Sequence, residues 1–366
     1  MKYQSQVIAN IWSRENQLAL WAVIEAANAA HRGAPLEVVT GIANTDVPTP
    51  EDVDQLEMLS GGHEMVSFLT LFTASMPDEM ACWVHRGLTT SDIVDTSVNV
   101  ALGRTAEYLA FRLSMLIQNL DDLFNVPTPR VAWTHGRPAS RTTLARQVDI
   151  ITRRLTLVVT ELLISKSGLS AMLSGPTGDS APPRWEEDLN DPSGIADLGR
   201  VYSSGQALDR VDRMPWVSAM TTAATALESV AQFLWDGIQR DEFRFEGTTS
   251  SSMPHKSNPT QLERVWGLAR LVRGLRVALD ESAVMRGDRD ISQSSVERVA
   301  YPQMSHLVAY SALELLECLD NIAVDSDVVA SICHVYETET HSFSRLLNAM
   351  EGGMSYLDAR DAAAGK

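Results

Sequence analysis

Residues 93–125 read IVDTSVNVALGRTAEYLAFRLSMLIQNLDDLFN, and this stretch decides the fold class. Its apolar residues recur at steps of three and four and it contains no proline, which is the pattern of an amphipathic helix. Residues 141–170, 215–240, 260–285 and 299–323 repeat the pattern. A helix of about 26 residues at 260–285 measures roughly 39 Å, well beyond the mean globular helix of ~11–12 residues. The sequence therefore predicts an all-α fold built on a bundle of long helices.

Two polar stretches interrupt the helical pattern. Residues 174–200 (SGPTGDSAPPRWEEDLNDPSGIADLGR) and 246–259 (EGTTSSSMPHKSNP) are rich in Pro, Gly and Ser, which predicts loops. The expected organisation is a small helical N-terminal domain at 1–92, a central long-helix bundle at 93–323 and a short C-terminal helical segment at 324–366.

Composition narrows the class of protein. The formal net charge is −17, from 30 Lys and Arg against 47 Asp and Glu, which argues against a nucleic-acid partner because such partners need a basic face. A few cations in one cleft can still attract a small anion. Three scattered cysteines, Cys82, Cys318 and Cys333, indicate neither a disulfide framework nor a zinc site. No long apolar run and no signal peptide are recognised, so we expect a cytoplasmic chain with no membrane partner.

Four polar segments lie at the ends of the predicted helices. TTSD before an apolar run favours a helix cap when taken alone, the histidine of THG could be structural, and the other two segments could be a linker and a solvated helix start. Their occurrence together, in this order, favours a functional site instead. The segments are WVHRGLTTSDIVDT (83–96), AWTHGRPASRTT (132–143), TTSSSMPHKSNP (248–259) and RGDRDISQSSVER (286–298).

The serine-rich loop resembles the signature Gly-Ser-Ser-x-Met-Pro-x-Lys-x-Asn-Pro of the fumarase/aspartase superfamily, with Thr249 at the usual glycine. THGRPASRTT resembles the THGxxAxPTT segment of the adenylosuccinate lyase branch, with Arg141 in place of proline. VHRGLTTSD resembles that branch's VHxGxTSxD, and RDISQSSVER resembles its RDISHSSxER. The opening KYQSQVIANIWSRENQLALW resembles RYSxxxMxxIWxxExxxxxW. The resemblance covers about residues 1–360, with a diverged patch at 174–214.

The resemblance implies three catalytic residues. Ser250 matches the base serine and His135 matches the general acid. His63, in GGHEMVSF, matches the histidine of the family's RHDVV segment, which assists near the acid. Because serine occupies positions 250, 251 and 252, Ser251 is the next candidate for the base.

The resemblance also implies a set of substrate-binding residues. Lys256 and Asn258 match the binders of the fumarate part. Arg289, Ser294 and Arg298 match positions that hold a carboxylate and a 5′-phosphate, for which the planar guanidinium fork is suited. The further matches are Lys2, Tyr3, His85, Thr89, Thr90, Thr134, Gln206, Ser251 and Met253. No metal and no organic cofactor is implied.

These residue types suit a β-elimination that breaks a C–N bond and releases fumarate. A base removes a weakly acidic proton next to a carboxylate, and the dianionic aci-carboxylate that results is viable only among aimed donors and cations. Lys256, Asn258 and the loop amides suit that task. The leaving nitrogen needs a proton from a general acid, and histidine is the usual choice near neutral pH. A serine base needs activation in a closed site, which a mobile loop can provide.

Oligomerisation is expected on two grounds. The long helices carry apolar residues on more than one face, and burying them requires partner chains. The resemblance implies a homotetramer whose sites take the His85 and Thr89 segment, the His135 segment and the Ser250 loop from three different subunits.

Three functions remain open at this point. The first is release of fumarate from adenylosuccinate, giving AMP, and from succinylaminoimidazole-carboxamide ribotide. The second is a paralogous lyase of a secondary pathway acting on another N-succinyl compound. The altered stretches at 174–200 and 284–288 favour this alternative. The third, a non-enzymatic scaffold, is disfavoured because Ser250, His135 and Lys256 are all present.

Overall fold

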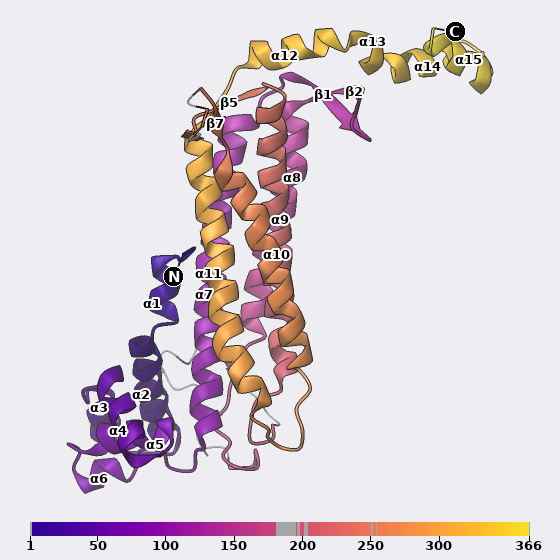
Figure 1. Cartoon of the computed structure of the whole chain (residues 1–366). Coiled ribbons are helices and arrows are strands. Elements are labelled where there is room, and N and C mark those ends of the chain that lie inside the picture. The colour runs from indigo at the N-terminus through magenta and orange to yellow at the C-terminus, as the bar shows by residue number, and fades with distance from the viewer. Residues whose placement is uncertain are drawn as a thin grey trace. The chain divides into compact units, whose positions relative to one another are not determined.

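The computed structural model describes residues 2–180, 195, 198–200, 204–249, 252–253 and 255–365. Within these ranges the chain is built almost wholly from helices, and its strands are short (Figure 1). The predicted all-α fold with long bundled helices is confirmed.

The long helices are α7 (Thr90–Phe124), α8 (Leu144–Ser167), α9 (Met214–Gln239), α10 (Thr260–Glu281) and α11 (Ser292–Asp320). The shorter helices are α1 (Gln6–Ile11), α2 (Arg14–His31), α3 (Leu36–Ala43), α4 (Pro50–Ser60), α5 (Glu64–Thr73), α6 (Asp78–Ala81), α12 (Ser326–Val335), α13 (Glu337–Thr340), α14 (Ser342–Glu351) and α15 (Tyr356–Ala363), with a 3₁₀ turn at Arg210–Arg213. The strands are β1 (Pro129–Thr134), β2 (Arg137–Thr143), β3 (Ser170–Ala171), β4 (Gly199–Arg200), β5 (Phe243–Phe245), β6 (Thr248–Thr249), β7 (Ser257–Asn258) and β8 (Ile322–Val324).

Local signals explain where several helices begin. The Ser13 hydroxyl accepts the backbone N–H of Asn16 at 3.1 Å at the start of α2. Thr49 does the same for Asp52 at 3.2 Å, directly before Pro50 in the first turn of α4. These are the preferred residues for an N-cap and for a first helical position.

Periodicity predicts a helix that begins at residue 299, whereas α11 begins earlier, at Ser292. The Asp290 carboxylate accepts the Ser292 backbone N–H at 2.8 Å, so a cap outside the apolar pattern starts the helix. α11 also continues through Pro302, whose ring removes one backbone donor without ending it.

The segment 132–143 is a correction to the sequence prediction, which expected no strand and treated it as the end of a helix. It belongs to an antiparallel hairpin, in which Thr134 pairs with Arg137 and Pro129 with Thr143. A bulge between Ala132 and Trp133 shifts the register. Because the hairpin is short and one of its strands is largely polar, it carries too little alternation to be recognised as strand.

Contacts divide the chain into two compact units, and each is assembled from three stretches. The first unit comprises Met1–Phe111, Val159–Thr222 and Arg270–Tyr310. The second comprises Arg112–Val158, Ala223–Ala269 and Ser311–Lys366.

The first unit has an aromatic core at its N-terminal end. Trp21, Phe68 and Phe72 are fully buried. Phe68 lies edge-on to Trp21, with ring centroids 5.3 Å apart, and is stacked on Phe72 at 5.2 Å. This core packs α2 and α5 together, which fixes the residues that precede each helix.

The second unit buries a further aromatic cluster. Phe124 contacts Phe233 and Phe243 at centroid distances of 5.3 and 5.0 Å. Arg130 of β1 lies over the rings of Phe233 and Phe243, at 5.0 and 5.1 Å. The base of the hairpin is thereby anchored in the core of this unit.

In the part of the chain that the structure describes, no helix combines the length and apolar character needed to cross a bilayer. Among the same residues, no group of three or more His, Cys, Asp or Glu side chains is placed to hold a metal ion.

Candidate active site

The residues singled out from the sequence fall into both compact units. Lys2, Tyr3, His63, His85, Thr89, Thr90, Gln206, Arg289, Ser294 and Arg298 belong to the first unit. Thr134, His135, Met253, Lys256 and Asn258 belong to the second. Ser250 and Ser251 lie outside the described residues.

A small cavity in the first unit brings five of these residues together. Its volume is about 80 Å³, and His63, Thr90, Arg289, Ser294 and Arg298 all line it. They come from the starts of α5, α7 and α11 and from the loop before α11. Segments far apart in sequence therefore converge on one polar cavity.

His63 sits at the N-terminus of α5 and caps it. Its Nδ1 accepts the backbone N–H of Met65 at 3.1 Å, so the neutral imidazole carries its proton on Nε2. With Nδ1 engaged by Met65, His63 can donate from Nε2 in the cavity.

The start of α7 is built around Asp92, which is completely buried. Its Oδ2 accepts the backbone N–H of Thr89 at 2.6 Å and the Thr89 hydroxyl at 2.9 Å. Its Oδ1 accepts the backbone N–H groups of Ser174 and Gly175, at 2.6 and 3.1 Å. At the start of α7 it is therefore the Asp92 carboxylate that accepts the Thr89 backbone N–H, and the Thr89 hydroxyl donates to the same carboxylate. The next residue, Thr90, lines the cavity.

His85 is held by a carboxylate that sequence reasoning missed. Glu25 is completely buried and accepts the backbone N–H of His85 at 2.6 Å, while its other oxygen lies 2.8 Å from the His85 Nδ1. His85 has a φ of 55°, a strained conformation for a non-glycine residue. The sequence did hold a signal for this contact, because Glu25 is the only acid in the apolar stretch VIEAANAAH. An acid in an apolar helix is rarely buried without a partner.

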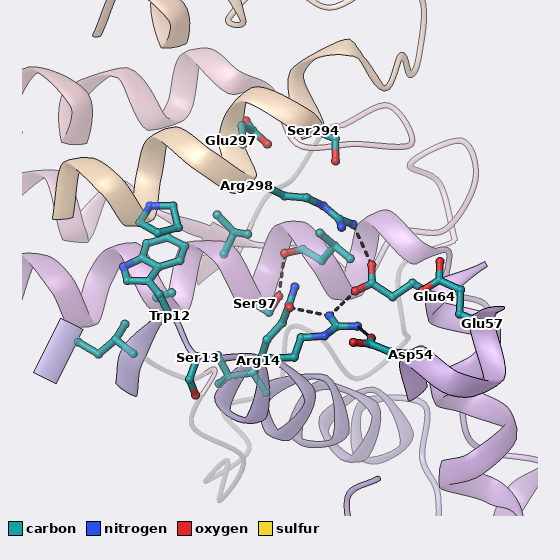
Figure 2. Close-up of a pocket in the computed structure, with 17 residues that line it drawn as sticks. Trp12, Ser13, Arg14, Asp54, Glu57, Glu64, Ser97, Ser294, Glu297 and Arg298 are labelled. Carbon is teal, nitrogen blue, oxygen red and sulfur yellow. Dashed lines mark hydrogen bonds and ion pairs between the residues drawn. The ribbon is translucent and has the colours of Figure 1, made fainter. Parts of the chain in front are cut away.

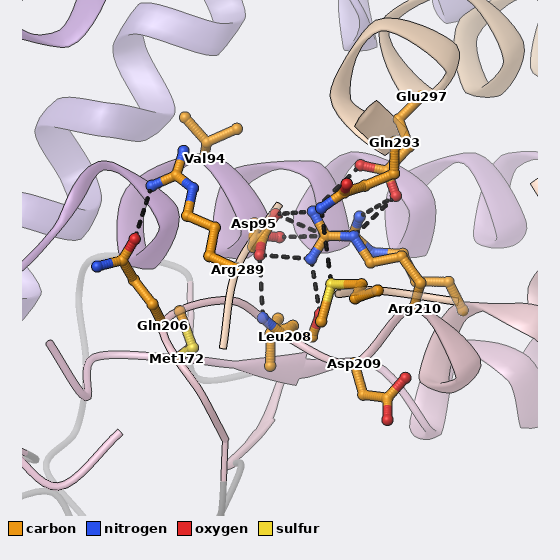
Figure 3. Close-up of polar contacts among 12 residues, drawn as sticks. Val94, Asp95, Met172, Gln206, Leu208, Asp209, Arg210, Arg289, Gln293 and Glu297 are labelled. Atoms are coloured by element: carbon orange, nitrogen blue, oxygen red, sulfur yellow. Dashed lines mark hydrogen bonds and ion pairs between the residues drawn. The ribbon is translucent and has the colours of Figure 1, made fainter. Parts of the chain in front are cut away.

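A buried ion-pair network lies beside the cavity, and Figure 3 shows part of it. Arg210 lies 2.7 Å from Asp95 and 3.0 Å from Glu297. Arg213 lies 3.0 Å from Glu297. Burial opposes the charge of Arg213, but Glu297 and Asp95 outweigh it and raise the pKa of the guanidinium above its ordinary value.

This network joins α7 to the first turns of α11, because Asp95 belongs to α7 and Glu297 to α11. Glu297 directly precedes Arg298, so the network fixes the part of α11 that carries the predicted anion-binding residue. The sequence assigned no role to Arg210 or Arg213, which stand in its diverged patch.

Gln206 and Arg289, which were each matched to a substrate-binding position, contact each other. The Arg289 guanidinium donates to the Gln206 side-chain oxygen at 3.2 Å, and Figure 3 shows this contact. The Gln206 backbone N–H donates to the Asp288 carbonyl at 3.2 Å. A side chain at Gly205 would approach within 2.9 Å of that same carbonyl, so the close approach requires glycine.

A larger cavity of about 450 Å³ shares part of its lining with the small one. Ser294, Glu297 and Arg298 line both. The larger cavity adds Trp12 and Arg14 from the beginning of the chain (Figure 2). Lys2 and Tyr3 are outside both described linings, and the Tyr3 ring instead lies edge-on to Tyr310 at 5.4 Å.

His135 lies at the exposed tip of the β1–β2 hairpin in the second unit. His135 and Gly136 have φ angles of 52° and 72°, which is the two-residue turn that the strand twist favours. Thr134 directly precedes this turn and is exposed as well. The turn presents the imidazole to solvent or to another chain.

The base of the hairpin is rigid. Arg130, only 2% exposed, donates from Nε to the Glu242 carboxylate at 3.0 Å and also bonds to Gln147. Nearer the tip, Trp133 packs edge-on against Tyr336 at 5.4 Å and under the Arg240 guanidinium at 4.7 Å. A mobile tip would place its histidine poorly, so this anchoring suits a precise role for His135.

The serine-rich loop begins and ends in a two-residue ladder, with Thr248 opposite Asn258 and Thr249 opposite Ser257. The backbone N–H of Lys256 donates to the carbonyl of Met253 at 2.9 Å. Lys256 is exposed, so its ammonium is open to solvent or to a ligand.

Comparison with known proteins shows which family the chain resembles. The family profile described as lyase matches residues 9–274. An adenylosuccinate lyase of Synechocystis sp. is 28% identical over 98% of this chain and 85% of its own length. One from Methanothermobacter thermautotrophicus is 29% identical over 88% of this chain and 76% of its own length.

Solved structures show the same fold. A 3-carboxy-cis,cis-muconate lactonizing enzyme from Pseudomonas putida aligns with a TM-score of 0.83 at 18% identity, over 99% of this chain and 85% of that one. A fumarate lyase from a Mesorhizobium species aligns with a TM-score of 0.83 at 16% identity, over 100% of this chain and 86% of that one. Because the profile covers most of the chain, the protein belongs to this lyase family, as its resemblance to the fumarase/aspartase superfamily predicted.

Proposed function

We propose that the protein is an adenylosuccinate lyase, which cleaves a C–N bond by β-elimination, releases fumarate from adenylosuccinate and gives AMP. The same chemistry extends to succinylaminoimidazole-carboxamide ribotide. The observation that carries this proposal is the near full-length similarity to relatives of that name. The convergence of five matched residues on one cavity supports it independently.

In the proposed reaction one carbon of the substrate bears the leaving nitrogen, and Ser250 removes a proton from the neighbouring carbon. The electron pair passes into the adjacent carboxyl group, giving an aci-carboxylate that Lys256 and Asn258 stabilise. The C–N bond then breaks, the double bond of fumarate forms, and His135 gives its proton to the leaving nitrogen. His63 assists as a neutral donor, which its Nδ1 contact with Met65 favours.

The anionic ends of the substrate are assigned to the first unit. Arg289, Ser294 and Arg298 lie together in the small cavity, and guanidinium groups bind carboxylates and phosphates in bidentate fashion. The remaining matched residues, His85, Thr89, Thr90, Thr134, Gln206 and Met253, complete the site in this proposal. His85 and Thr89 act largely by shaping it, since their polar groups contact Glu25 and Asp92.

The active assembly is proposed to be a cytoplasmic homotetramer with shared sites. Each site takes the His85 segment, the His135 hairpin and the Ser250 loop from three subunits. Apolar side chains that one chain leaves exposed support association, including Leu157 (56% exposed), Ile164 (63%) and Val277 (62%) on the long helices.

The test is fumarate release from adenylosuccinate, followed by the change in ultraviolet absorbance of the purine. A lyase for another N-succinyl compound would share the elimination chemistry and differ in the nucleotide-binding part, and the named relatives favour adenylosuccinate over it. Turnover of N-succinyl amines without turnover of adenylosuccinate would reject the proposal.

A further inference from the structure

One carboxylate lies between two guanidinium groups in the larger cavity of the first unit. The Glu64 Oε1 is paired with Arg14, and its Oε2 lies 2.8 Å from the Arg298 Nη2 (Figure 2). Arg298 was matched to an anion-binding position from the sequence, whereas Arg14 was not. A bridging arrangement of this kind is how two arginines hold a phosphoryl group.

The cavity around this cluster is large enough for a nucleotide. Its volume of about 450 Å³ lies within the ~300–1,000 Å³ of small-molecule sites. One wall is apolar, with Leu20, Val98 and Pro302, and Trp12 adds an aromatic side chain. It shares Arg298 with the small cavity, so a ligand can span both.

Arg14 is held in place before any ligand binds. Its Nη1 donates to the Gln17 side chain at 2.8 Å, its Nη2 lies 3.6 Å from Asp54, and its Cζ lies 5.5 Å from the centre of the Trp21 ring. Its side chain is 25% exposed, against 60% for Arg298. Arg14 is therefore the more rigid of the two cations.

The sequence suggests why an additional arginine, Arg14, lies beside Glu64. In the segment that resembles RHDVV, Gly62 stands where the motif has arginine. Gly62 has no side chain to offer a charge, while Arg14 reaches Glu64, two residues further along, from a different helix.

We propose that Arg14 is a second phosphate-binding guanidinium, and that Glu64 occupies the place of the phosphoryl group until substrate enters. The inference rests on the proposed function, since it assumes a nucleotide substrate. A dianionic phosphoryl group matches two guanidinium groups better than a single carboxylate does. On binding, the phosphoryl oxygens replace the Glu64 oxygens on Arg14 and Arg298, and the sugar and base lie along the apolar wall.

The first experiment measures binding of AMP and of adenosine by isothermal titration calorimetry. Arg14→Gln should weaken AMP binding on the order of 10- to 100-fold, the value of a charged hydrogen-bond partner, and leave adenosine binding nearly unchanged. Arg14→Lys should lie between, because it keeps the charge but loses the fork. Arg104 is exposed and is not among the described residues that line the cavity. Arg104→Gln is therefore the matched control, and it should change neither the Kd for AMP nor that for adenosine.

The second experiment tests the role of Glu64. Glu64→Gln removes the competing charge and should lower the Kd for AMP several-fold. Glu57→Gln, the same change at a half-buried position on the wall of this cavity, should not. If Glu64→Gln weakened AMP binding as much as Arg14→Gln does, Glu64 would be holding the arginines rather than standing in for the phosphate.

The two proposals fail differently. An equal effect of Arg14→Gln on AMP and adenosine, or no effect on either, overturns the phosphate role of Arg14 even if the wild type turns over adenylosuccinate. Absence of wild-type turnover, with AMP binding still selectively lost in Arg14→Gln, rejects the proposed function and leaves the anion site standing.

Discussion

The Nδ1 atom of His63 accepts the backbone N–H of Met65 at 3.1 Å, so one side chain both caps α5 and faces the small cavity. Two substitutions separate these roles. His63→Asn keeps a good N-cap and should leave unfolding in urea unchanged, while kcat falls on the order of 10²-fold or more through loss of the donor. His63→Ala should lose about 1 kcal/mol of stability as well. Equal kcat for His63→Asn and wild type would remove His63 from the catalytic set.

The hairpin turn offers a clean test of the general acid. His135 has a φ of 52° and is followed by Gly136, and Asn-Gly is the favoured sequence for such a turn. His135→Asn should therefore fold at least as stably as wild type while kcat drops on the order of 10²- to 10⁴-fold. Thermal unfolding and steady-state kinetics are the two readouts. A loss of activity matched by a loss of stability would indicate a structural role instead.

Alkaline pH should destabilise the first unit through Tyr301. Burial raises the pKa of Tyr301 to about 12, against ~10 in an unfolded chain. The buried hydroxyl favours the folded state fully below pH ~10, and this contribution disappears at about 1.4 kcal/mol per pH unit as pH rises from ~10 towards ~12. Urea unfolding across that range should show a shallower decline for Tyr301→Phe. The exposed Tyr356, changed to Phe, is the control and should follow wild type.

Shared sites can be tested by mixing inactive variants. Ser250→Ala and His135→Asn subunits should regain activity after subunit exchange, since some sites would receive both unaltered segments. Ser250→Ala mixed with Lys256→Ala should stay inactive, because both residues belong to the same loop and no site would receive an intact one. Recovery in both mixtures, or in neither when exchange is shown by mass spectrometry, would contradict the assembly.

Periodicity in the sequence predicted the long helices well. The segment 215–240 corresponds to α9 (Met214–Gln239) and 93–125 to α7 (Thr90–Phe124), because a sustained apolar stripe is a local property of the chain. The hairpin was missed because its turn depends on two residues with positive φ, and His135-Gly136 is not one of the dipeptides, such as Asn-Gly, that mark such a turn in a sequence.

The residues of the cavity were partly predictable. Motif matching singled out Thr90, Ser294 and Arg298, all of which line this cavity, and their role in substrate binding stays a prediction. It could not reveal the long-range contacts around the site, since Glu25 meets His85 across a separation of 60 residues, and Arg210 meets Asp95 across 115. Such contacts depend on the packing of helices distant in sequence, and no local pattern records them.

The most direct test of the central claim is to incubate the purified protein with adenylosuccinate and quantify both products by chromatography. Fumarate and AMP should appear in a one-to-one ratio, and Ser250→Ala should form neither while still binding AMP. Ser252→Ala, a change at a serine of the same run that was not matched to the site, should retain most of the activity. No fumarate from adenylosuccinate, or formation unaffected by Ser250→Ala, would contradict the account.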